Sequence, residues 1–134
     1  MRTALHGAIF LALLISAQVS IAQNPPSILT MGPAATISCG TWMQERESFR
    51  RTGTATPRLV VMQTWVGGFL TGSNDSMFIL SKKDFLEDSQ VDGDAAFGWI
   101  DNYCRAQPLN TLYDASAALV TELEKKATFN NTVR

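Results

Sequence analysis

The first 22 residues of the sequence constrain the fold most, because they predict that the chain is exported. Arg2 and His6 give a short positive start, Ala8–Ile15 is an unbroken apolar run, and Ser20–Ala22 fits a cleavage site of small residues. This is the pattern of a secretory signal peptide. We therefore expect residues 1–22 to be removed, which leaves 112 residues. That length allows one domain with one modest core, and it excludes a doubly wound nucleotide-binding fold or a full α/β barrel.

The mature composition excludes several classes of function. No second apolar stretch of about 20 residues follows, so we expect a periplasmic or secreted protein with no membrane contact after cleavage. His6 is the only histidine and leaves with the signal peptide, which excludes Ser-His-Asp triads, Cys-His pairs and zinc sites that use histidine. The mature chain then has ten Lys and Arg residues and twelve Asp and Glu residues. Without a basic excess, nucleic acid is a poor candidate partner.

Cys39 and Cys104 are the two cysteines of the chain. In an oxidising compartment the default interpretation is one disulfide between them, and two separate free thiols are the alternative. The bridge would close a loop of 65 residues. The chain-entropy model values such a loop at about 4 kcal/mol, as an upper figure.

Apolar residues at helical spacing predict an all-α fold, a small bundle of about four helices in a domain spanning 38–127. The first expected helix begins near Ser38. The other three are expected to cover about Arg58–Leu70, Asp94–Arg105 and Leu112–Lys126. The proline-containing segment 23–37 is expected to be a flexible N-terminal arm, residues 48–57 a polar connection, and 128–134 a polar tail. Ser38, Asp92 or Asp94, and Thr111 with Asp114 are the expected helix caps.

The second expected helix carries the most distinctive pattern. Its apolar face holds Leu59, Trp65 and Phe69, and Val60-Val61 leaves a strand open as an alternative. Gly67-Gly68 in its interior predicts the close approach of another backbone, and Gly72 is the expected helix end. The three tryptophans of the chain fall one to each of the first three helices, where we expect core positions.

Acidic residues concentrate in and after the least certain stretch, residues 76–93. Five of them lie between Asp84 and Asp94. A solvated acidic loop is the main interpretation, and a calcium loop is the alternative. The calcium pattern lacks D-x-D-G in the required order and a glutamate at its twelfth position, so no metal is expected. Further on, Asp101 and Arg105 have the spacing of an ordinary surface ion pair.

The sequence gives no sign of an enzyme. It contains no G-x-S-x-G, no phosphate loop and no G-x-G-x-x-G. Carboxylates remain the main acid–base candidates, and nothing in their spacing forces two of them into one pocket. We therefore expect no catalytic residues and no cofactor.

One resemblance to a known family rests on Cys39, the Trp65-bearing helix and the segment Tyr103–Tyr113, which reads Y-C-x-x-x-P-x-x-x-L-Y. In these features the chain resembles the HdeA/HdeB family of periplasmic acid-stress chaperones. The resemblance implies a small exported helical protein with one disulfide, a homodimer at neutral pH that dissociates in acid and binds unfolding clients. Leu59, Trp65 and Phe69 would then form the apolar binding face that acid makes accessible.

A second, weaker resemblance rests on Trp65–Gly72, the W-V-G-G-F-L-T-G segment. It is similar to the aromatic-glycine helix of the Tai-like immunity proteins of type VI secretion. Those proteins are also small, exported, helical and disulfide-bonded, and they block a secreted amidase. This resemblance implies a secreted effector enzyme as the partner, in place of unfolding clients.

Overall fold

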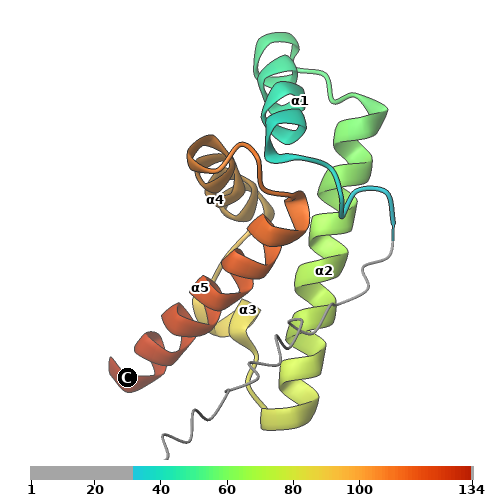
Figure 1. Ribbon diagram of the computed structural model, residues 1–134. Helices are drawn as coiled ribbons and strands as arrows, with labels where there is room; N and C mark the ends of the chain where they lie inside the picture. The colour runs from blue at the N-terminus through green and yellow to red at the C-terminus, as the bar shows by residue number, and fades with distance from the viewer. Residues whose placement is uncertain (1–31, 134) are drawn as a thin grey trace, which may run out of the picture.

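Helices account for most of the residues that the computed structural model describes, which are 32–133. They are α1 (Cys39–Thr52), α2 (Pro57–Ser81), the short α3 (Phe85–Ser89), α4 (Gly93–Ala106) and α5 (Leu112–Val133). Figure 1 shows α2 running along one side of the molecule, with α1 packed against α4 near one end and α3 packed against α5. The expected all-α bundle is confirmed.

Side-chain caps explain where the helices begin. Ser38 Oγ accepts a hydrogen bond from the Thr41 amide at 3.2 Å, and Asp92 Oδ1 accepts one from the Ala95 amide at 2.7 Å. Thr111 and Asp114 exchange hydrogen bonds at the start of α5, at 2.8 Å and 3.2 Å. These are the caps that the sequence predicts, and each satisfies an amide that has no partner within the helix.

The core lies between the four long helices and is closed by a disulfide. Cys39 at the start of α1 bonds to Cys104 near the end of α4, so the predicted bridge is present. Trp42 is fully buried beside it. The largest other buried side chains come from α2, α3, α4 and α5: Leu59, Met62, Phe85, Ile100, Leu112 and Leu119.

Two expectations about α2 are wrong. The helix does not end at Gly72 but continues to Ser81, where Lys82 adopts a left-handed conformation with φ of 59°. No backbone approaches Gly67 or Gly68, because nothing lies within 4 Å of a β-carbon built at either position. Val60-Val61 is helical, as the main interpretation predicts, and the strand alternative is wrong. Packing of the later turns explains the extension, since Met77 lies against the core and the Asn74 amide bonds Asp84 at 3.0 Å.

The C-terminal helix also runs further than its pattern indicates. α5 continues past Lys126 to Val133, so residues expected as a polar tail are helical. Ala127 is buried, and Asn130 and Asn131 donate hydrogen bonds to Asp88 of α3 at 2.8 Å and 2.9 Å. These contacts with α3 extend the helix beyond its regular apolar pattern.

The segment before α1 packs against the domain. Ala34 and Ala35 are buried, and the amides of Leu112 and Tyr113 donate to the carbonyls of Ile37 and Ala35 at 2.8 Å and 3.3 Å. The described end of the expected flexible arm is therefore held against the start of α5. The expected signal peptide and residues 23–31 lie outside the described residues.

Candidate functional site

A buried carboxylate joins α1 to α4. Asp101 of α4 accepts hydrogen bonds from Trp42 Nε1 at 2.7 Å, from Arg46 Nε at 3.0 Å and 3.1 Å, and from Arg50 Nη1 at 3.1 Å. We call these four residues the Asp101 cluster. Every hydrogen bond to the carboxylate comes from α1, because Trp42, Arg46 and Arg50 are spaced four residues apart and share one helix face.

The Asp101 cluster is shielded from water on one side. The side chains of Asp101 and Arg46 are only 8% and 14% exposed. The Arg46 guanidinium lies 5.7 Å and 5.9 Å from the ring centres of Trp42 and Phe97. Arg50 is more open and also pairs with Glu47 on the surface. Arg46 thus depends on one carboxylate for its counter-charge within this environment.

The α1–α4 contact is held at two points. Cys39 comes three residues before Trp42, and Cys104 comes three residues after Asp101. The disulfide therefore fastens one end of the contact covalently, and the Asp101 cluster fastens the next turn by charge and hydrogen bonds. Further along α1, Glu45 accepts a hydrogen bond from Thr56 Oγ1 at 2.6 Å and lies 3.7 Å from Arg58, which ties α1 to the start of α2.

The expected surface pair between Asp101 and Arg105 does not form. Asp101 points into the α1–α4 contact, and Arg105 bonds Asn102 at 2.8 Å. The spacing within α4 could not reveal this. The missed signal was the pairing of the two cysteines, because a Cys39–Cys104 bridge brings the residues one turn away, Trp42 and Asp101, to the same contact.

The three residues expected to form an apolar binding face lie in two environments. Leu59 is completely buried in the core, so it is no part of the surface of the folded protein. Trp65 and Phe69 are half-buried and stack at 5.4 Å between ring centres. The edge of Phe69 meets Tyr113 at 5.6 Å, and Gly32 lies against Trp65. Exposure of this face in acid stays a prediction.

A surface with a single charged residue lies on the side of α2 that faces away from the core. This outer face of α2 consists of exposed residues at helical spacing: Val60, Val61, Thr64, Gly67, Gly68, Thr71, Gly72, Asp75 and Ile79. Asp75 is its one charged residue. A helix on the surface of a soluble protein normally places charged and polar side chains outward. Ile79 is 63% exposed and the neighbouring Leu80 is 86% exposed, so the C-terminal end of α2 is the most apolar part of this surface.

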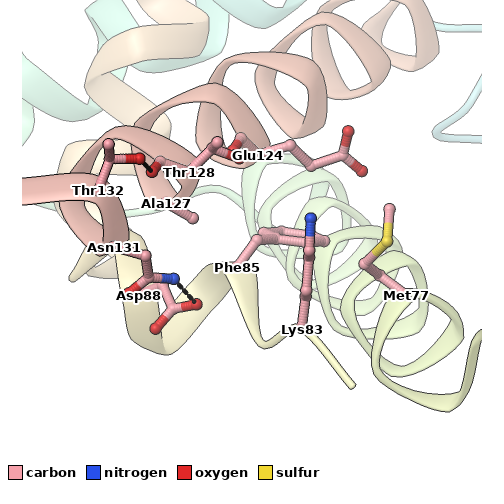
Figure 2. Close-up of a pocket in the computed structure, with 9 residues that line it drawn as sticks. All are labelled: Met77, Lys83, Phe85, Asp88, Glu124, Ala127, Thr128, Asn131 and Thr132. Carbon is pink, nitrogen blue, oxygen red and sulfur yellow. Dashed lines mark hydrogen bonds between the residues drawn. The ribbon is translucent and has the colours of Figure 1, made fainter. Parts of the chain in front are cut away.

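A cavity of about 290 Å³ lies between the end of α2, α3 and the last turns of α5. Figure 2 shows Lys83 and Glu124 pointing into the same opening from the α2–α3 connection and from α5. Phe85 and Ala127 form a buried apolar floor. The sequence pattern gave no indication of this cavity, because its walls come from three separate segments.

Asp84 begins α3 and connects it to α2. Its carboxylate accepts hydrogen bonds from the Glu87 amide at 2.9 Å and from Asn74 Nδ2 at 3.0 Å. These bonds favour the ionised form and hold the pKa of Asp84 below its usual 3.8, chiefly through the Glu87 amide. Asp84 and Asp92 thus serve as helix caps, within a stretch expected to be a solvated acidic loop.

The described residues, 32–133, contain no group of three or more histidine, cysteine or acidic side chains that could hold a metal ion. None of the helices in this part of the chain is long and apolar enough to cross a membrane. Comparison with known proteins finds no family model, curated protein or solved structure that matches the chain.

Proposed function

We propose that the protein is an exported, non-enzymatic chaperone that holds unfolding clients in acid, as its resemblance to the HdeA/HdeB family implies. The observation that carries the proposal is the buried carboxylate of Asp101, which holds two arginines of α1. An acid-activated protein needs a group that stabilises the closed state when ionised and ceases to do so when protonated. Asp101 has the position and the partners for that role.

The proposed trigger is the loss of the negative charge of Asp101 in strong acid. A neutral Asp101 would leave the guanidinium groups of Arg46 and Arg50 without their shared counter-charge, and Arg46 would stay poorly hydrated between two rings. Leaving a buried charge unpaired is strongly unfavourable. Relief would come from moving these turns of α1 away from α4 into water.

Protonation of the other carboxylates would add charge repulsion throughout the molecule. Protonating all twelve acidic side chains would move the mature chain from −2 to +10. Self-repulsion of that size destabilises compact states. The Glu45 contacts with Thr56 and Arg58 would weaken once that carboxylate lost its charge. The second half of α1 would then lose its ties to α2 as well as to α4.

Opening α1 would expose the apolar surface that it covers. Trp42 packs on Phe97 at 6.0 Å between ring centres, and Leu59 at the start of α2 belongs to the same buried core. The disulfide would keep the first turn of α1 attached to α4, so the protein would open without unfolding completely. Apolar surface held on a tethered scaffold is what capture of an unfolding client requires.

The direct test is light scattering from an aggregating client protein at pH 7 and at about pH 2–3. We expect the exported protein to suppress aggregation only in acid, together with increased binding of a dye that reports exposed apolar surface. A protein that remains disulfide-bonded in acid yet gives no protection there would end the chaperone proposal.

A second candidate function is that of an immunity protein that binds and inhibits a secreted effector at neutral pH. The outer face of α2 favours it, because this surface carries only one charge and is present in the folded state. Specific inhibition needs such a preformed surface. Here Val61→Glu or Ile79→Glu would abolish binding to the effector at pH 7, Glu122→Gln on α5 would leave it unchanged, and the protein would protect no client in acid.

A further inference from the structure

The cavity between α2, α3 and α5 has the composition of a small-molecule site. Its volume of about 290 Å³ lies just below the usual range for such sites, about 300–1,000 Å³. It is separate from the Asp101 cluster, which joins α1 to α4. A ligand here would be small, and its binding would not depend on the proposed chaperone activity.

The floor of the cavity is apolar and already formed. Phe85 and Ala127 are 2% and 6% exposed, and half-buried Met77 closes the side formed by α2. A floor of this kind favours a ligand with an apolar side chain about as long as the floor, because burying that side chain removes apolar surface of both the ligand and the protein from water.

Two opposite charges face the cavity without partners. Among residues 32–133, neither the ammonium of Lys83 nor the carboxylate of Glu124 forms an ion pair or side-chain hydrogen bond. Asp88 differs, because its carboxylate accepts a hydrogen bond from Asn131 at 2.9 Å (Figure 2). Of the three charged side chains in the lining, Lys83, Asp88 and Glu124, only Lys83 and Glu124 thus have no partner among residues 32–133.

From this arrangement we propose that the cavity binds a small zwitterion with an apolar side chain, that is, a free apolar amino acid. Its ammonium group would pair with Glu124, its carboxylate would pair with Lys83, and its side chain would lie on Phe85, Met77 and Ala127. A simple anion would face Glu124 as a like charge, and a simple cation would face Lys83. The zwitterion matches both charges and the floor.

The test is a calorimetric titration of the exported protein at pH 7 with L-leucine, L-methionine and L-phenylalanine. The comparison compounds are 3-methylbutylamine, which is leucine without its carboxylate, and 4-methylpentanoate, which is leucine without its amine. We expect at least one amino acid to bind, and both comparison compounds to bind about tenfold more weakly or worse, since each lacks one charge-assisted bond.

Variants assign the site. Lys83→Gln and Glu124→Gln should each weaken amino-acid binding about tenfold, and Ala127→Leu should block it by filling the floor. Lys126→Gln and Glu122→Gln are the matched controls, because both residues are exposed on α5 outside the cavity lining, and binding should not change. The proposal is overturned if none of the three amino acids binds, or if 3-methylbutylamine or 4-methylpentanoate binds as tightly as the amino acids. It is also overturned if the Lys83→Gln and Glu124→Gln variants are folded by circular dichroism and bind the amino acid as tightly as the unchanged protein.

Discussion

At the scale of single residues, Asp101 supplies the charged contact between α4 and α1. It lies at 6% exposure and accepts hydrogen bonds from Trp42, Arg46 and Arg50. A buried ion pair contributes little net stability relative to an apolar pair, yet removing one partner is costly because the other charge stays buried. The cluster therefore makes the closed state sensitive to the charge of one side chain.

Asp101→Ala should lower the free energy of unfolding at pH 7 by about 3–5 kcal/mol, because Arg46 loses its buried counter-charge. Urea denaturation followed by circular dichroism measures this change. The matched control is Asp94→Ala, which removes an exposed aspartate from the first turn of the same helix. That control should cost less than about 1 kcal/mol. Equal effects of the two substitutions would show that the cluster does not hold α1.

Substitutions at two glycines, Gly68 and Gly53, should change the stability of the protein in opposite directions. Gly68 is exposed within α2 and has nothing within 4 Å of a built β-carbon, whereas Gly53 ends α1 with φ of 71°. Gly68→Ala should stabilise the protein by about 0.5–1 kcal/mol because alanine favours the helix. Gly53→Ala should destabilise it, because alanine disfavours a left-handed backbone. Thermal unfolding of the two variants checks the opposite signs, and destabilisation by Gly68→Ala would indicate a close neighbour that α2 lacks in this structure.

At the scale of helices, caps and the disulfide were predictable, whereas helix ends and side-chain directions were not. Ser38, Asp92 and Thr111 act locally, so their sequence signals were sufficient. Glycine frequently ends a helix, but the packing of Met77 and the hydrogen bond between Asn74 and Asp84 stabilise turns of α2 beyond Gly72. The Asp101–Arg105 spacing fits a surface pair, but only the neighbouring α1 determines which way Asp101 points. Both wrong predictions followed from local patterns that tertiary contacts override.

The capping residue of α3 gives a pH dependence of defined sign. The pKa of Asp84 lies below 3.8 in the folded protein, so its charge stabilises the fold above that value and this contribution is lost as the pH falls through the folded pKa. Asp84→Asn keeps a cap acceptor but removes the charge. We expect the variant to be less stable than the unchanged protein at pH 7, with the difference shrinking below pH 3.8. Urea denaturation at pH 7 and in this acidic range tests it. A difference that stays constant with pH would exclude the charge as its cause.

At the scale of the whole molecule, the disulfide and the Asp101 cluster both hold α1 against α4. The disulfide does not respond to pH and is worth about 4 kcal/mol on the chain-entropy model, as an upper figure. The cluster depends on an ionised carboxylate. Acid therefore acts on the second fastening alone, and the proposed active state is a partly opened bundle tethered between Cys39 and Cys104.

A single substitution should reproduce the proposed effect of acid. Asp101→Asn removes the charge of the carboxylate but keeps its shape, so at neutral pH it should open α1 in the way proposed for protonation of the unchanged protein. Asp94→Asn makes the same chemical change at an exposed position of α4. The disulfide is retained in both variants.

The decisive measurement is the light scattering of an aggregating client at pH 7 in the presence of each protein. We expect Asp101→Asn to suppress aggregation at pH 7, and the unchanged protein and Asp94→Asn to suppress it only at about pH 2–3. If Asp101→Asn is helical and disulfide-bonded but leaves aggregation at pH 7 unchanged, the charge of Asp101 does not control client binding, and the central claim is contradicted.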